Sequence, residues 1–236
     1  LGGQSVDTVG GLITLVAQEG SVIMDQAASM NVSAAGAQSA GQLSVSATQG
    51  SASLKGALLG QSQTQDLGAS LVVDAQSGIS LDGIAEAVKG ELNFAQQVSL
   101  RSRGTDNLTL GSEKSISAAQ VSVVSEGGGI TIQGGLHADT ATGGSLLVAA
   151  GKDLTLDGAQ LSAKSTSTSA NVVSSAGRID LQSATSPSFG ATLVSLDGTK
   201  VAAALDDFDA LFAMLEDPAP AAEPDTKYSG MKLPIA

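Results

Sequence analysis

The sequence predicts an all-β protein, a parallel β-helix solenoid followed by a short C-terminal α-helix and an extended tail. Three observations predict this fold. Residues 1 to about 186 contain no proline and one aromatic residue, short apolar-x-apolar units recur through them, and Leu-Asp-Gly occurs three times. Proline-free backbone permits long hydrogen-bonded ladders. A narrow solenoid interior accepts only small inward residues, which matches an aromatic content of 2%.

The composition excludes several classes of function. The chain has 236 residues, 42% of them hydrophobic, so any core is built from Val, Leu, Ile and Ala in thin layers. It has no Cys, which excludes disulfides, thiolate metal sites and Cys nucleophiles. Its 11 Lys and Arg are scattered among 23 Asp and Glu, so we expect no nucleic-acid partner at a net charge of -12. No apolar run reaches the ~18 to 20 residues of a membrane span.

The repeated unit is a pair of apolar residues separated by one residue. Alternation with a period of two indicates a strand with one buried face. Successive units often start eight or nine residues apart. The units are Ile13/Leu15, Val22/Met24, Met30/Val32, Leu43/Val45, Leu71/Val73, Ile79/Leu81, Leu92/Phe94, Val98/Leu100, Leu108/Leu110, Val121/Val123, Ile130/Ile132, Leu146/Val148, Leu154/Leu156 and Ile179/Leu181.

The turns between these units also recur, as Ser80–Gly83, Thr155–Gly158 and Ser195–Gly198, all ending Leu-Asp-Gly. Asp-Gly after a strand favours a turn, because Gly accepts positive φ and Asp bonds the following backbone. Irregular recurrence is typical of coils of ~20 residues with variable loops, which predicts about nine coils and a rod about 40 Å long. An antiparallel sandwich is the alternative fold, although its strands would normally be longer and its tight hairpins more frequent.

Many short motifs between about residues 10 and 185 resemble, in a consistent order, the filamentous haemagglutinin-like exoproteins of Gram-negative bacteria. The motifs are GQLSVSA at Gly41–Ala47, LKGALLG at Leu54–Gly60, VSLRSR at Val98–Arg103, GSLLVAAGKDLTLDG at Gly144–Gly158 and GRIDL at Gly177–Leu181.

This resemblance implies a right-handed parallel β-helix within a very long surface or secreted protein, exported by two-partner secretion through an outer-membrane transporter. The secretion domain of that family usually carries Asn-Pro motifs, and this chain contains none. We therefore expect a shaft or C-terminal portion, with the transporter acting through a region outside this chain. A start at Leu1, without Met or a leader pattern, also favours a piece of a longer protein.

Candidate catalytic and metal-binding residues are few. His137 is the single His, and we expect it in a solvated loop rather than at a metal, since one nearby Asp is a poor ligand set. Nothing in the sequence positions a Ser-His-Asp triad. Glycoside hydrolysis needs two carboxylates about 5 to 9.5 Å apart, whereas Asp82, Asp157 and Asp197 are explained by turns. We expect no catalytic residue, cofactor or metal.

Adhesive contacts are expected in irregular insertions, because coil residues are committed to ladders while loops vary freely. Two segments qualify, Gly60 to Gly68 and Ile84 to Gln97. Their candidate contact residues are Gln61, Gln63, Gln65, Asp66, Glu86, Lys89 and Glu91.

The sequence divides the chain into three regions. These are a shaft at 1–198, an amphipathic helix at 199–217 that is the expected cap, and a flexible Pro-containing tail at 218–236. The apolar residues of the helix are spaced 4, 3, 4 and 3 apart, which places them on one helical face. We expect this helix to cap the open end or flank of the solenoid, with a partner-binding helix as the alternative. The stripe is Val201, Leu205, Phe208, Phe212 and Leu215.

Together these observations favour a non-catalytic structural and adhesive segment of a secreted or surface-displayed Gram-negative protein, a monomeric rod that presents loops to a host receptor or glycan. A polysaccharide-active β-helix enzyme is one alternative. A trimeric spike segment from a phage tail or secretion apparatus is the other.

Overall fold

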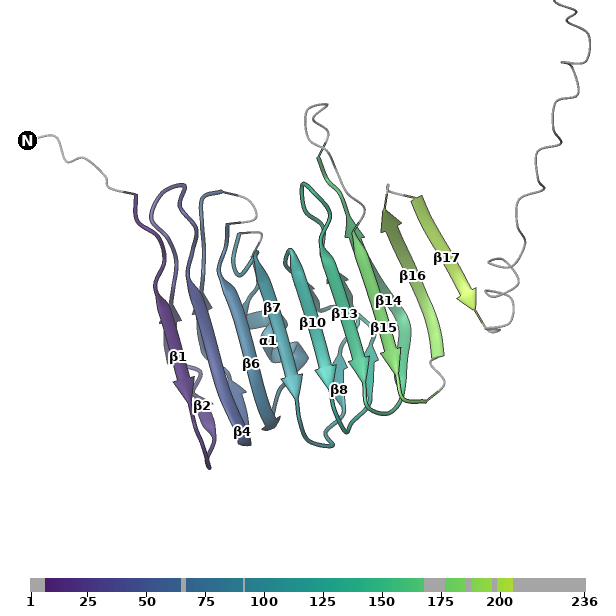
Figure 1. The fold of residues 1–236 in the computed structure, drawn as a ribbon, viewed down its shortest axis with the longest axis horizontal. Helices are drawn as coiled ribbons and strands as arrows, with labels where there is room; N and C mark the ends of the chain where they lie inside the picture. Colours follow the sequence, from purple (N-terminus) through teal and green to yellow (C-terminus); the bar gives the residue numbers. More distant parts are fainter. Residues whose placement is uncertain are drawn as a thin grey trace, which may run out of the picture. The chain divides into compact units, whose positions relative to one another are not determined.

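A computed structural model describes residues 7–64, 67–90, 92–167 and 177–185, and the backbone of two strands at 188–196 and 199–205. These residues form a β-solenoid of about five turns, built mostly from parallel strands with one short helix (Figure 1). The predicted parallel β-helix is confirmed.

The longest sheet of the solenoid takes one strand from each coil. Each strand pairs in parallel with the strands one coil before and one coil after it. In order, the strands are β1 (Leu12–Val16), β4 (Gln42–Leu54), β6 (Ser70–Ser77), β7 (Gln97–Ser102), β10 (Gln120–Ser125), β13 (Ser145–Ala150) and β15 (Arg178–Ser183).

Two columns of aliphatic side chains fill the interior beneath this sheet. The strand register places the first apolar residue of each unit in one column and the second in the other. Each fully buried Leu or Val in such a column stabilises the fold by about 1.5–3 kcal/mol. The columns are Ile13, Leu43, Leu71, Val98, Val121, Leu146 and Ile179, and Leu15, Val45, Val73, Leu100, Val123, Val148 and Leu181.

The strands of the other two faces are divided by helix α1 (Leu81–Ala87), which contacts β4 on one side and the following coil on the other. Before α1, β2 (Val22–Met24) pairs with the end of β4, and β3 (Ser29–Asn31) pairs with β5 (Ala57–Leu59). After α1, the strands are β8 (Leu108–Leu110), β9 (Ser115–Ser117), β11 (Ile130–Ile132), β12 (Gly135–His137), β14 (Leu154–Lys164) and β16 (Ser188–Leu196).

The coils are longer than predicted. Gln97, Gln120 and Ser145 occupy equivalent positions, so two successive coils take 23 and 25 residues, and the coil from Ser145 to Arg178 takes 33. The prediction of nine coils of about 20 residues is therefore wrong. Each coil carries three faces and their corners, and the sequence pattern marked the faces but not the length of the corners.

Most of the predicted apolar pairs form strands, but two do not. Leu81 begins α1, and Leu92 and Phe94 lie in a turn and a bend, with Phe94 fully buried at a φ of 48°. The turn expected at Asp157 is also wrong, because Asp157 lies inside β14 at an irregularity in the ladder. Gly158 takes a φ of 68° there, which lets the strand turn the corner and continue.

The helix expected from residue 199 does not begin there. Thr199–Leu205 forms strand β17, next to β16 in the sheet. A spacing of four between Val201 and Leu205 fits a strand period of two as well as a helix, and a neighbouring strand supplies backbone partners that a helix does not use. Residues 206–236, with Phe208, Phe212, Leu215 and the predicted tail, lie outside the described residues.

Candidate functional site

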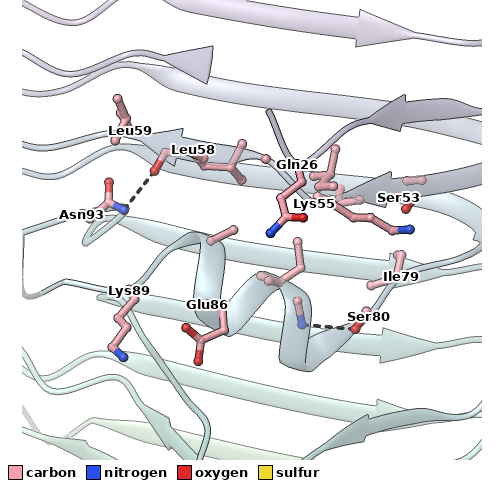
Figure 2. Close-up of a pocket in the computed structure, with 18 of the residues that line it drawn as sticks. Gln26, Ser53, Lys55, Leu58, Leu59, Ile79, Ser80, Glu86, Lys89 and Asn93 are labelled. Carbon is pink, nitrogen blue, oxygen red and sulfur yellow. Dashed lines mark hydrogen bonds between the residues drawn. The ribbon is translucent and has the colours of Figure 1, made fainter. Parts of the chain in front are cut away.

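A cleft of about 630 Å³ lies between the corner joining β4 to β5 and helix α1. Figure 2 shows Lys55 and Leu58 on one side of it and Ser80 and Glu86 on the other. The cleft exists because the coil that follows β5 runs as a helix where its neighbours have strands. It is the place where the repeat is interrupted.

Local sequence explains why a helix forms at this point. The Ser80 side chain accepts a hydrogen bond from the Gly83 backbone N–H at 3.1 Å, which caps the first turn. Leu81 and Ile84 are buried against the solenoid interior, and the Asp82 carboxylate accepts a hydrogen bond from the Gly111 N–H at 2.8 Å. The segment Ser80–Gly83 is thus a helix start, and its interpretation as a turn is wrong.

Asn93 closes the edge of β5 beside the helix. Its side-chain amide donates to the Leu58 carbonyl at 3.1 Å and accepts from the Gly60 N–H at 2.7 Å. A residue of a neighbouring parallel strand would make this same pair of bonds through its backbone. Asn93 is 5% exposed, so its amide replaces a missing strand and satisfies backbone groups that would otherwise be buried without partners.

The charges at the cleft are unevenly paired. Glu86 forms an ion pair with Lys114, and the hydrogen bond from Lys114 lowers the pKa of Glu86, with Lys114 and Lys89 charges acting in the same direction. Glu86 is the single carboxylate among the described lining residues, and it is held ionised, which is the opposite of a general acid. Lys55 and Lys89 are exposed and have no ion-pair partner among the described residues. The rim of the cleft therefore carries two free cations in an acidic chain.

The structure brings the two predicted adhesion segments together. Gln61 and Asn93 form an antiparallel bridge, and Gln61, Glu86 and Lys89 all line the cleft. Gln63 lines a second hollow of about 540 Å³, which Gln61 also borders.

Part of the second segment is not the irregular loop that we expected, because its first residues are helical and pack on the core. Gln65, Asp66 and Glu91 lie outside the described residues. The sequence interpretation missed Gln26 and Lys55, which lie outside the two segments and reach the cleft through the stacking of coils. It also missed Asn93, which lies in the second segment but was not among its candidate contact residues.

A second polar cluster surrounds His137. This residue lies in strand β12, not in a solvated loop, and is half-buried. Its Nδ1 lies 2.8 Å from the Ser162 Oγ, and that hydroxyl donates to the Asp139 carboxylate at 3.0 Å. Since the single hydroxyl proton is directed to Asp139, the His137 Nδ1–H is the donor to Ser162. Lys164 Nζ lies 3.7 Å from Asp139 and completes the cluster.

This order differs from that of a nucleophile. In a Ser-His-Asp triad the His lies between the other two residues and takes the serine proton. Here Ser162 lies in the middle and donates a hydrogen bond to the Asp139 carboxylate. Its side chain is buried, at 6% exposure. Burial lowers the pKa of His137, while the Asp139 charge acts in the opposite direction. The cluster ties neighbouring strands together rather than activating a hydroxyl.

Within the residues that the structure describes, no group of three or more His, Asp or Glu side chains is placed to hold a metal ion. No helix of this part of the chain is long and apolar enough to cross a membrane. Comparisons of the chain with protein-family models, with curated proteins and with solved structures find no match.

Proposed function

We propose that this chain is a non-catalytic structural and adhesive segment of a secreted or surface-displayed bacterial protein of the filamentous haemagglutinin-like kind. The solenoid is the shaft, and the cleft beside α1 is the contact site for a host-surface ligand. Export by two-partner secretion, through a region outside this chain, belongs to the same proposal. The resemblance of the motifs supports the family, and the cleft supports the contact site.

The observation that carries the adhesive proposal is the interruption of the repeat at α1. Some outward side chains of the regular coils stand in ladders of like residues, such as Gln97 beside Gln120. The cleft combines a recess with residues of several coils. Recognition of one ligand needs such a concave, non-repeating site.

Charge indicates the class of ligand. Lys55 and Lys89 lie at the rim without an ion-pair partner among the described residues, while Glu86 is paired with Lys114. The amides of Gln26 and Gln61 add hydrogen-bonding groups suited to hydroxyl-rich molecules. We therefore propose an anionic glycan, bearing carboxylate or sulfate groups, as the ligand.

The test is binding of the full chain to immobilised sulfated and uronate-containing glycans at increasing salt concentration. The double variant Lys55→Glu, Lys89→Glu should lose binding, and wild-type binding should weaken with salt because exposed charges are screened. Lys152→Glu, which changes an exposed lysine outside the cleft, is the matched control and should bind as wild type. Equal binding by the double variant would refute the cleft as the contact site.

The same preparations test the alternatives. Release of soluble oligosaccharides from these glycans would favour the polysaccharide-active enzyme over the adhesive segment. A trimeric mass in solution would favour the spike segment.

A further inference from the structure

Leu59 brings an exposed hydrophobic side chain into the cleft. Five large hydrophobic side chains are exposed among the described residues, and four of them lie before residue 24. The fifth, Leu59, is 38% exposed and lines the cleft. In the preceding coil the equivalent position is held by the polar residue Asn31, so this leucine does not belong to an apolar ladder along the surface.

The exposure of Leu59 results from the interruption of the repeat. Strand β5 pairs with β3 on one edge and with no described strand on the other, because the next coil runs there as helix α1. Its two outward residues, Ala57 and Leu59, therefore border the cleft. Ile79 and Ala87, both half-buried, add apolar surface from the segment that carries α1. The cleft thus combines apolar surface with the charged groups at its rim, as ligand sites usually do.

An uncommitted amide lies next to Leu59. Gln61 is two residues further along the chain, is exposed like Leu59 and also lines the cleft. Its side-chain amide makes no hydrogen bond to a described residue, whereas the Asn93 amide is already bonded to the backbone beside it. Side chains two residues apart on an extended segment start about 7 Å from each other. A ligand that contacts both residues therefore carries an apolar group and an amide close together.

An acetamido group has this combination. Its methyl group is apolar and fits Leu59, and its amide donates and accepts hydrogen bonds as the Gln61 side chain does. In Figure 2, Lys89 and Leu59 both lie toward the left end of the cleft, so an anionic group beside the acetamido group meets a lysine. A uronate next to an N-acetylhexosamine supplies all three groups.

We propose that the cleft is specific for a glycan in which a uronate adjoins an N-acetylhexosamine, with Leu59 as the residue that selects the acetyl group. This inference rests on the proposed binding of an anionic glycan and names the ligand within that class. The carboxylate pairs with the lysines of the rim, and the acetamido group contacts Leu59 and Gln61. Charge alone favours the most highly charged glycan, whereas contact with Leu59 favours an acetylated one.

The test compares two oligosaccharides that differ by one methyl group in each amino sugar. Both alternate a uronate with an amino sugar, and one carries N-acetyl groups where the other carries N-formyl groups, so their charge and their amides are the same. Competition with an immobilised anionic glycan measures the affinity of the full chain for each. The N-acetyl form should bind about fourfold more tightly, which is the effect of burying one methyl group.

Three variants assign this preference to residues. Leu59→Ala should bind both forms with equal affinity, and it should fold because Leu59 is exposed. Leu12→Ala, which shortens an exposed leucine outside the cleft, is the matched control and should keep the fourfold preference. Gln61→Ala should weaken the binding of both forms about equally, since both forms keep the amide.

The outcomes separate this inference from the proposed function. If the wild type does not prefer the N-acetyl form, if the preference survives Leu59→Ala, or if Gln61→Ala binds as wild type, the inference is overturned while the anionic-glycan proposal stands. If the chain binds no anionic glycan at all, the proposed function fails and this inference fails with it.

Discussion

Ser102 is the buried polar group whose replacement should stabilise the solenoid. Its hydroxyl is fully buried and has no hydrogen-bond partner, which is true of no other described side chain. In the same column of the ladder, Ala75 and Ala150 occupy the equivalent position of other coils, so an alanine fits the site. Burying an unpaired hydroxyl costs about 1–3 kcal/mol, and Ser102→Ala removes that cost while leaving a void of one oxygen atom.

We expect Ser102→Ala to raise stability by about 1 kcal/mol and the melting temperature by about 2–4 °C, for a chain of this size. Ser125→Ala is the matched control, because Ser125 lies beside Ser102 in register but accepts a bond from Gly128 N–H at 3.1 Å and donates to the Asp106 carbonyl at 3.3 Å. That variant should lose about 1–2 kcal/mol. Thermal melts by circular dichroism compare the two. A Ser102→Ala chain destabilised as much as the control would refute the reasoning.

Three further predictions concern the ladder, the cleft and pH. Leu156→Asp should lower the free energy of unfolding by several kcal/mol, because it buries an unpaired charge, whereas Asp157→Asn should leave it nearly unchanged. Urea titrations of both variants measure the difference. Asn93→Ala leaves the Gly60 N–H and the Leu58 carbonyl unpaired and should lower the free energy of unfolding by about 2–3 kcal/mol. An unchanged melting temperature would contradict this role of Asn93. Because burial lowers the pKa of His137, the folded chain protonates at lower pH than the unfolded one, so stability is full above about pH 6.5 and falls below it. His137→Gln should lessen this loss of stability between pH 7.5 and 5.5. If stability falls equally steeply with pH in the variant and the wild type, His137 is not its cause.

Most of the strands that the sequence predicted contribute two inward residues. Leu43 and Val45, or Val121 and Val123, show the period of two directly. The missed strand β9 contributes a single buried residue, Ile116, and β12 has Leu136 beside a glycine. One apolar residue defines no period, so these strands are fixed only by pairing with neighbouring coils.

Helix α1 escaped prediction because it is short and begins with a sequence that favours turns. Seven residues give fewer than two full helical turns, too few for a 3.6-residue period to stand out. A signal was nevertheless present. Ser80 is a favoured N-cap residue, and Leu81, Ile84, Ala85 and Val88 follow at spacings that place them on one helical face.

The cleft itself depends on the register between coils, which the sequence pattern does not encode. Gln61 meets Asn93 from 32 residues away, and Lys55 faces the helix that carries Glu86. The His137 cluster has the same origin, since Ser162 lies opposite His137 in the ladder of β12 and β14. A prediction of either site needs the length of each coil, and the corners that set this length carry no periodic signal.

The charges of the cleft set how ligand binding should depend on salt. A site with two exposed lysines and a Glu86 paired with Lys114 supplies a modest, salt-sensitive attraction for an anionic ligand. Firm attachment to a dense surface then requires several clefts to engage together, since each further contact becomes intramolecular and the apparent affinity rises without any new contact within a cleft.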